Sequence, residues 1–312
     1  MGIYYALRAQ YWFVNGYTSD ILFALSGGAT IVNLWHGLPM KCIEFGIRAG
    51  VLKKRYVDRE WREVFYHPAC FIRPDYVAST TAFIDDIFAL SFRIHPSRCL
   101  HVGYPRNRLF LSDRNHATAF IHRYESDQTI ELVGRLQAYR HVYVYMPTWR
   151  DSQANLFAGG MDLTRLNSVL ASNDDVMLMK PHANTHIDAS VAYSNLIFLD
   201  SSVDMYAILP FTDVLVSDYS SVLFDYMLMA DKAIILYHYD YDEYVREREF
   251  NFPVAEHLEG TVVTDFEQLL HVIATHAHPV DHERRRAVID KLWGTTATLD
   301  SATTLFSLIL KS

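Results

Sequence analysis

The sequence is poor in the features that usually mark disulfide-rich or zinc proteins. It contains three cysteines in 312 residues, Cys42, Cys70 and Cys99, and no two of them form a CxxC pair. This odd number and wide spacing predict reduced, structural thiols rather than a disulfide framework. HExxH motifs and clustered carboxylates are also missing, so we predict no metal site. No cofactor is specified, and Mg²⁺ is left open.

Long hydrophobic runs are missing as well. The most apolar stretch, residues 222–239, is interrupted by charged side chains such as Asp225 and Asp231, which argues against a bilayer span. Arg8 and Asn15 interrupt the apolar residues near the N-terminus, so we expect no signal peptide. These absences predict a cytoplasmic protein that touches a membrane, if at all, from the inside.

Positive charge is in the minority. There are 28 Lys and Arg against 36 Asp and Glu, which gives a net charge of −8. A general nucleic-acid binder needs a basic face to neutralise backbone phosphates, so we expect no nucleic-acid partner. A small phosphorylated substrate remains compatible with this charge, because a few local cations are enough to bind it.

Two glycine-rich nucleotide motifs, GxGxxG and GxxxxGK[ST], do not occur, so dinucleotide and P-loop sites have no support. Instead, short apolar runs alternate with helix-length patterns, which is typical of βαβ units and doubly wound parallel sheets. The predicted strands are residues 30–35, 76–78, 99–102, 141–146, 176–179, 196–199, 214–217 and 233–237. The predicted helices include residues 81–91, 115–137, 163–172, 202–209, 221–229 and 265–275.

The length suits two domains of about 150 residues each. We place the boundary near residue 138, between the polar helical stretch 115–137 and the strand that starts at His141. The predicted domains are therefore residues 1–138 and 139–312. The first strong strand begins only at Thr30, so we expect a shortened N-terminal domain. Two such sheets would leave a cleft at their strand ends, where ligands of open α/β folds bind.

Polar residues that could perform chemistry follow the strands of the N-terminal half. In WHGLPMK, Gly37 and Pro39 predict a turn that presents His36, whose imidazole could act as a general base near neutral pH. A turn histidine bonded to the backbone is an equal alternative. In GYPRN, Arg106 could grip a phosphate with two hydrogen bonds, although a surface arginine is as good an interpretation.

The C-terminal half offers more candidates at strand ends. Thr148 and Arg150 follow strand 141–146, and Lys180 and His182 follow strand 176–179. His182 could pair with a phosphate or protonate a leaving oxygen, and its position is the reason to consider it. A lone histidine is more often structural.

The strongest signal is the sequence SDYSS at residues 217–221, between a strand and a helix. One serine can be explained as a helix cap. The hydroxyls of Ser220 and Ser221, next to Asp218 and to free N–H groups at a helix start, also predict a phosphate cradle.

Taken together, these segments resemble the CDP-glycerol glycerophosphotransferase family, the teichoic-acid primases and polymerases and their capsule-polymer relatives. The matching strings are WHGLPMK, GYPRN, PTWRD, KPH, SDYSSVLFDYMLMADKAIILY, DYDEY and REREFNF. The resemblance implies an α/β fold of GT-B type, with an acceptor-side domain and a CDP-glycerol-binding domain. It also implies that glycerol phosphate passes from CDP-glycerol to a hydroxyl of a lipid-linked polymer and that CMP leaves.

The resemblance assigns roles to the candidate residues. His36 would deprotonate the acceptor hydroxyl, and His182 would contact the diphosphate. Ser220 and Ser221 would hold the diphosphate oxygens. The residues implied to bind substrate are Arg106, Thr148, Arg150, Lys180, Asp218, Ser220 and Ser221.

Several positions depart from the family pattern. Leu38 stands where the family has Thr, Arg108 where it has Asp, and Ala183 where it has Pro. Glu249 replaces a Gly, and Glu259 replaces the usual Pro before a glycine. His36 and the SDYSS sequence are kept, so we expect the chemistry to be kept. Three points stay open: the identity of the acceptor polymer, whether the donor is CDP-glycerol or CDP-ribitol, and whether the chain primes or extends the polymer.

Two other functions stay open. The first is a nucleotide-sugar glycosyltransferase or epimerase, because one fold serves many reactions. The second is a non-catalytic nucleotide-binding remnant.

One segment has a composition suited to membranes. Residues 46–62 include Arg48, Lys53, Lys54 and Arg55 among aromatic and aliphatic residues. A basic amphipathic helix can lie on an anionic leaflet, which predicts peripheral attachment to the inner face of the plasma membrane. A solvated basic face or a groove for acceptor phosphates is the alternative.

Overall fold

The protein is represented by a computed structural model of the 312-residue chain, which describes residues 2–148, 160–180, 192–200 and 202–309. Contacts divide the chain into two compact units. Unit 1 comprises Met1–Pro105, Asp242–His257 and Ala287–Ser312, and unit 2 comprises Arg106–Tyr241 and Leu258–Arg286.

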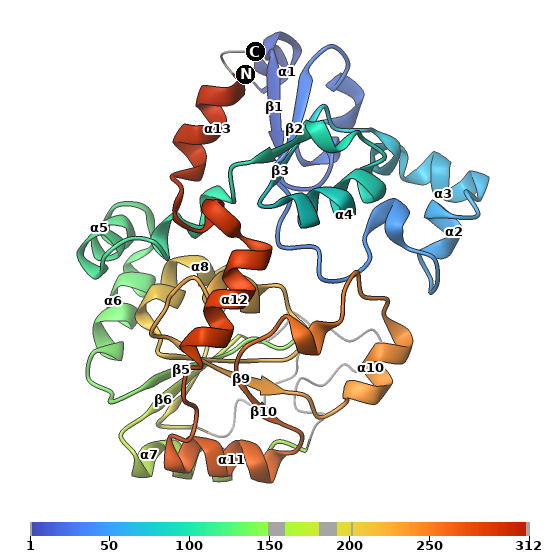
Figure 1. Cartoon of the computed structure of the whole chain (residues 1–312). Coiled ribbons are helices and arrows are strands. Elements are labelled where there is room, and N and C mark those ends of the chain that lie inside the picture. Colours follow the sequence, from blue (N-terminus) through green and yellow to red (C-terminus); the bar gives the residue numbers. More distant parts are fainter. Residues whose placement is uncertain (1, 149–159, 181–191, 201, 310–312) are drawn as a thin grey trace. The chain divides into compact units, whose positions relative to one another are not determined.

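Unit 1 is built on a four-stranded parallel sheet in the order β1-β2-β3-β4 (Figure 1). Its strands are β1 (Tyr11–Val14), β2 (Thr30–Asn33), β3 (Tyr76–Ser79) and β4 (Cys99–His101). The expectation that the first strand lies at residue 30 was wrong, because β1 precedes it and pairs with it in register from Tyr11 opposite Thr30.

Helices complete unit 1. They are α1 (Gly2–Arg8), α2 (Lys53–Tyr56), α3 (Trp61–Tyr66), α4 (Ala82–Phe92), α10 (Tyr241–Glu247) and α13 (Ser301–Ile309). The helix α12 (His282–Leu292) begins in unit 2 and ends in unit 1.

Unit 2 contains a six-stranded parallel sheet in the order β10-β9-β8-β5-β6-β7. Its strands are β5 (Val142–Tyr145), β6 (Val176–Met179), β7 (Leu196–Phe198), β8 (Val214–Ser217), β9 (Ala233–Tyr237) and β10 (Thr261–Val263). Numbered within the unit, this is the order 3-2-1-4-5-6 of nucleotide-binding Rossmann folds. The order reverses between β5 and β8, so a ligand is expected at the carboxyl ends of these two strands.

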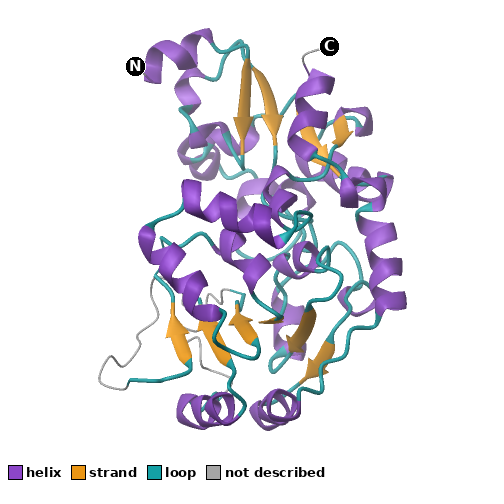
Figure 2. Cartoon of the chain, turned by 90° about the vertical axis from the view of Figure 1, so that its left-hand side faces the viewer, coloured by secondary structure: helices purple, strands orange, loops and turns teal. Residues whose placement is uncertain are grey.

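The central strands of unit 2 are mostly apolar because both of their faces are covered. Every residue of β5, β6, β8 and β9 is buried, as expected for central strands of a parallel sheet. The helices are α5 (Arg114–Tyr124), α6 (Asp127–Leu136), α7 (Leu163–Ser172), α8 (Met205–Ile208), α9 (Val222–Tyr226) and α11 (Phe266–Thr275). Helices α7 and α11 lie side by side (Figure 2).

The sequence explains where several of these helices begin. A side-chain oxygen accepts a hydrogen bond from a backbone N–H of the first turn at five N-cap positions, which fixes the helix start. These residues are Asp113, Ser126, Asp162, Asp204 and Asp265. Ser126 also explains why the expected helix 115–137 is in fact two helices.

The division into units differs from the expected boundary near residue 138. Helices α5 and α6 belong to unit 2, and the chain returns to unit 1 twice, at Asp242 and at Ala287. Periodicity predicts that a helix has a buried face but not which sheet covers that face, so these crossings leave no local signal.

Two further expectations concern cysteines and the membrane. All three cysteines are free thiols, as expected, and burial raises the pKa of Cys99 to about 12. Among the residues described here, no helix is both long enough and apolar enough to cross a membrane.

The unusual Glu259 has a structural partner in unit 2. Its carboxylate accepts a hydrogen bond of 2.8 Å from Nε of Arg285, and both side chains are buried. Arg285 also donates to the carbonyl oxygens of Met229, Ala230 and Lys232. Glu259 therefore neutralises a buried guanidinium that anchors the start of α12.

Gly260, the next residue, packs closely against Ile234, and a substitution can test this contact. It has a φ of +150°, and a Cβ there would lie 2.8 Å from the carbonyl oxygen of Ile234. We expect Gly260→Ala to lower the free energy of unfolding by more than about 1 kcal/mol, measured by urea denaturation. The control Gly134→Ala, in open space on α6, should raise it by about 0.5–1 kcal/mol. Equal effects of the two substitutions would contradict the close contact.

Candidate active site

The loop after β2 holds His36 in unit 1. Trp35 precedes it with φ 51°, a left-handed conformation that is unfavourable for a bulky residue. The expected turn is therefore present, but its unusual backbone conformation lies at Trp35 rather than at Gly37. Trp35 is buried against Phe92, whereas His36 is exposed and lies against the Trp35 ring, with 4.2 Å between ring centroids. The buried tryptophan thus fixes the backbone that presents the imidazole.

Asn33 stabilises this strained turn. Its side-chain oxygen accepts the N–H of Trp35 at 2.9 Å, and its amide donates to the carbonyl of Gly16 at 3.0 Å. Asn33 is buried at the end of β2. It is a positioning residue that the sequence interpretation missed, because an asparagine at a strand end has no distinctive pattern.

The imidazole of His36 has a tautomer that suits a base. Its Nδ1 lies 3.3 Å from the carbonyl oxygen of Asn15. A carbonyl can only accept, so Nδ1 carries the proton and the lone pair of the neutral ring is on Nε2. The contact with the backbone that one sequence interpretation expects is therefore present, and the role of His36 as a general base stays a prediction.

The segment that follows His36 is fixed by residues 249–251, also in unit 1. The Asn251 amide donates to the carbonyls of Pro39 and Lys41, at 2.7 and 2.8 Å. The carboxylate of Glu249 accepts the N–H groups of Arg48 and Ala49 at 2.8 and 2.9 Å. The departure from glycine at residue 249 therefore adds two hydrogen bonds to the segment after this loop.

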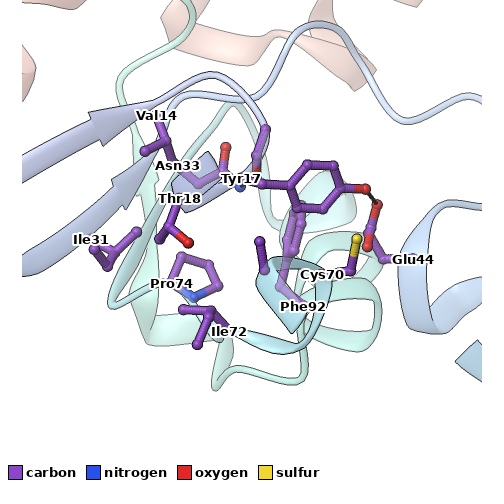
Figure 3. Close-up of a pocket in the computed structure, with 12 residues that line it drawn as sticks. Val14, Tyr17, Thr18, Ile31, Asn33, Glu44, Cys70, Ile72, Pro74 and Phe92 are labelled. Atoms are coloured by element: carbon purple, nitrogen blue, oxygen red, sulfur yellow. Dashed lines mark hydrogen bonds between the residues drawn. The ribbon is translucent and has the colours of Figure 1, made fainter. Parts of the chain in front are cut away.

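A cavity of about 20 Å³ lies beside this loop and shares Asn33 with it. Figure 3 shows Tyr17 pointing at Glu44, to which its hydroxyl donates a short hydrogen bond. Burial raises the pKa of the Glu44 carboxyl. The cavity has room for about one water molecule. It is therefore too small to bind a substrate.

The loop after β8 in unit 2 lies at the point where the strand order reverses. Asp218 is buried, and its Oδ1 accepts the N–H of Thr148 at 2.8 Å and that of Tyr219 at 2.6 Å. The hydroxyl of Ser217 donates to the carbonyl of Met146 at 2.5 Å. These contacts tie the carboxyl end of β5 to that of β8. They bring Thr148, in the described part of one segment that the sequence analysis singled out, next to the SDYSS segment.

The two serines of this loop are half-buried and have different contacts. Ser220 Oγ accepts the N–H of Val222 at 3.4 Å, whereas Ser221 makes no capping hydrogen bond. Helix α9 has only five residues, so its dipole is small. A phosphate at this loop would be bound mainly by hydroxyl and backbone N–H groups.

His238 is a neighbour of this loop that the sequence interpretation missed. It follows β9, and its Nε2 donates to the carbonyl of Asp218 at 3.3 Å. Its ring stacks on Tyr219 at 4.9 Å and on Tyr241 at 5.6 Å between centroids. Burial lowers the pKa of His238, so the ring is neutral at pH 7. The only signal in the sequence was a histidine directly after a predicted strand.

Lys180 and Arg106 both make contacts within unit 2. The Nζ of Lys180 donates to the carbonyls of Asp200 and Val203, each at 2.9 Å. Arg106 forms three hydrogen bonds of 3.0 to 3.1 Å with Asp225. These contacts support the loops around the switch point, and the predicted phosphate contacts of both cations stay predictions. Arg150 and His182 lie outside the described residues.

Asp225 is the centre of a buried polar cluster on α9. In addition to Arg106, it accepts hydrogen bonds from Asn107 at 3.0 Å and from the Tyr206 hydroxyl at 2.6 Å. The carboxylate is completely buried, so these donors replace the hydrogen bonds to water that its oxygens lose on folding.

A family profile described as CDP-Glycerol:Poly(glycerophosphate) glycerophosphotransferase matches residues 2–308. This chain belongs to that family. The expectation drawn from the matching strings is confirmed, and the match extends over segments such as β1 in which no motif was seen.

Two curated relatives align with part of this chain. One is a teichoic acid glycerol-phosphate transferase of Staphylococcus aureus, 30% identical over 56% of this chain and 43% of its own length. The other is a teichoic acid poly(glycerol phosphate) polymerase of Bacillus subtilis, 27% identical over 56% of this chain and 22% of its own length. The chain therefore spans less than half the length of either relative.

Solved structures agree with the fold. A variant of the wall teichoic acid polymerase TagF soaked with CDPG has a TM-score of 0.74 and 25% identity, and covers 97% of this chain and 73% of its own. A UDP-GlcNAc 2-epimerase from Neisseria meningitidis has a TM-score of 0.52 at 12% identity, over 96% of this chain and 76% of its own, which shows a shared fold only. The expected α/β class of GT-B type is confirmed.

The arrangement around Asp225 makes a prediction about the stability of this family member. Arg106→Gln should destabilise the protein by about 3–5 kcal/mol, because it leaves a buried carboxylate without its cation. The double variant Arg106→Gln with Asp225→Asn should recover most of that loss. Denaturant unfolding of both variants measures the effect, with exposed Arg108→Gln as the control. Unchanged stability with weakened nucleotide binding would instead assign Arg106 to the substrate.

Proposed function

We propose that this chain transfers glycerol phosphate from CDP-glycerol to a hydroxyl of a lipid-linked or polymeric acceptor of the teichoic-acid type and releases CMP. The observation that carries the proposal is the SDYSS loop at the strand-order switch point of unit 2, in a member of this family. The names of the relatives, a glycerol-phosphate transferase and a poly(glycerol phosphate) polymerase, support the same reaction.

Unit 2 would bind the donor. Its 3-2-1-4-5-6 sheet places the segment after β5 and the loop after β8 side by side, and Asp218 fixes both. The hydroxyls of Ser220 and Ser221 and the backbone N–H groups of the loop would hold diphosphate oxygens. His182, Arg150, Lys180 and Thr148 follow the same group of strands, and they remain predicted donor contacts.

Unit 1 would supply the base. In the neutral tautomer set by Asn15, Nε2 of His36 can accept the proton of an acceptor hydroxyl. The acceptor oxygen then forms a bond to the phosphorus that bears glycerol, and the bond from that phosphorus to the bridging oxygen breaks. The electron pair leaves with CMP. The protein would contribute positioning and charge stabilisation, as in other phosphoryl transfers.

The direct test of the reaction is an assay of CMP release. The chain is incubated with CDP-glycerol or CDP-ribitol and a lipid-linked acceptor, and products are identified by mass spectrometry. Acceptor-dependent CMP release with one added glycerol phosphate is expected. Binding of CDP-glycerol without turnover would instead indicate a non-catalytic nucleotide-binding protein.

The role of His36 makes a kinetic prediction. His36→Ala should lower turnover by about a hundredfold or more and leave the affinity for CDP-glycerol nearly unchanged, because a base acts in the transition state. The exposed His116→Ala is the control and should retain activity. Turnover and nucleotide affinity falling together would assign His36 to binding or to structure.

The serines make the opposite prediction. Ser221→Ala and Ser220→Ala should each weaken CDP-glycerol binding by about 1–3 kcal/mol, the value of a hydrogen bond to a charged group. Calorimetric titration measures this, and Ser168→Ala on α7 is a matched control, because its hydroxyl bonds only within its own helix. Wild-type affinity in both loop variants would exclude the phosphate cradle.

We also propose peripheral attachment of unit 1 to an anionic membrane, at the inner face of the plasma membrane. The basic helix considered for residues 46–62 is short: α2 covers Lys53–Tyr56, and α3 begins at Trp61 and ends at Tyr66. Their surface carries large exposed apolar side chains, including Val51 at 84% and Trp61, Phe65 and Tyr66 at 71% each. Lys53, Lys54 and Arg62 accompany them, whereas Arg55 is half-buried and paired with Glu63 at 2.8 Å.

This surface makes a binding prediction. Each basic residue near an anionic surface contributes about 1 kcal/mol, so replacing Lys53, Lys54 and Arg62 by Gln should release the protein from phosphatidylglycerol vesicles. Salt approaching about 1 M should do the same by screening. Cosedimentation measures binding, with Arg123, Arg135 and Arg140 replaced by Gln as a charge-matched control. If neither salt nor the substitution of Lys53, Lys54 and Arg62 changes vesicle binding, this surface is not the membrane contact.

A further inference from the structure

Three potential metal ligands meet at the amino-terminal edge of the unit 2 sheet. His141 directly precedes β5, Asp175 directly precedes β6, and His276 follows the last residue of α11. One donor atom from each of these side chains lies within 4.8 Å of the other two. They are 34 and 101 residues apart along the chain, so no sequence motif marks them.

The Asp175 carboxylate is shared between the two imidazoles. Its Oδ1 lies 3.1 Å from Nδ1 of His141, and its Oδ2 lies 2.7 Å from Nε2 of His276. The carboxylate is completely buried, whereas the His141 and His276 side chains are 28% and 19% exposed. The cluster therefore has a buried anion at its base and is open to solvent on the histidine side.

The backbone holds these side chains in place. Asp174 and His276 both have left-handed conformations, with φ of 57° and 52°, which are uncommon for residues other than glycine. The Asn195 amide donates to the Asp175 carbonyl at 2.7 Å. Helix α7 ends shortly before Asp175, and α11 ends next to His276. The two helices pack against each other, which is consistent with the contact between these two side chains. The donors are thus positioned by β5, β6, β7 and α11 rather than by a flexible loop.

We propose that His141, Asp175 and His276 form a binding site for a divalent transition metal of the Zn²⁺ type. Two imidazole nitrogens and one carboxylate oxygen are ligands that Zn²⁺ takes, and a water molecule can complete the tetrahedron from the open side.

We assign this site a structural role because it lies away from the candidate donor site. It lies at the amino-terminal ends of β5 and β6, whereas the candidate donor site lies at the carboxyl ends of β5 and β8. A metal here joins two strands to a helix and stabilises unit 2 without contact with the reacting groups.

His278 provides a neighbouring control. Its ring is 6.1 Å from that of His276 between centroids, and its Nε2 lies 3.0 Å from the Tyr143 hydroxyl. Because this nitrogen has a partner of its own, we leave His278 out of the ligand set. The substitution His278→Gln removes a neighbouring imidazole and leaves the three proposed ligands in place.

The test is a titration of the full chain, stripped with a chelator, with ZnCl₂. One equivalent should bind, and at about 100 times the dissociation constant the melting temperature should rise by about 5 °C or more. His141→Gln, Asp175→Asn and His276→Gln should each weaken binding by at least about tenfold, and His278→Gln by less than about threefold. Calorimetry measures the affinities, and elemental analysis measures the stoichiometry.

Two results would overturn the proposal. One is a melting temperature of the wild type that does not respond to Zn²⁺. The other is a response that persists at full size in His276→Gln, which would assign the metal to other histidines. His276 is partly exposed, so its variant keeps the test decisive even if Asp175→Asn fails to fold. In either case the cluster would be a hydrogen-bonded one without metal.

Discussion

The candidate donor site depends on one buried carboxylate, that of Asp218. It accepts the N–H groups of Thr148 and Tyr219 at the place where the strand order reverses. A buried charge is tolerated only when such donors surround it. Asp218 therefore fixes the ends of β5 and β8 together, and this fixes where Ser220 and Ser221 can present their hydroxyls. His238 supports the same loop from β9 through the Asp218 carbonyl.

In unit 1, the loop that carries His36 is fixed by a strained backbone conformation at Trp35 rather than by a buried carboxylate. A left-handed tryptophan costs about 1–3 kcal/mol, and the buried Trp35 ring and the Asn33 hydrogen bonds offset that cost. The result is an exposed imidazole on a rigid support. Leu38, which stands where the family has Thr, is buried, so this departure adds a buried apolar side chain rather than a hydroxyl close to His36 in the sequence.

The sequence predicts those features that depend on neighbouring residues. Strands β5, β6, β8 and β9 form continuous apolar runs because both of their faces are buried. The SDYSS sequence stood out because serines at a strand-to-helix turn have few roles. The edge strands β1 and β10 were missed, although strands as short as β4 and β7 were predicted.

Features that depend on distant residues could not be predicted in this way. The pairing of Arg106 with Asp225, 119 residues away, and the approach of His238 to Asp218 arise from strand order. The same is true of the cluster of His141, Asp175 and His276. The two returns of the chain to unit 1 also left no local signal.

The most direct test of this account is a crystal structure of the chain with CDP-glycerol. The account predicts that the diphosphate lies at the carboxyl ends of β5 and β8, with its oxygens within hydrogen-bond distance of the Ser220 and Ser221 hydroxyls. A nucleotide bound away from the loop at residues 217–221, with Asp218 and both serines making no contact to it directly or through water, would contradict the account.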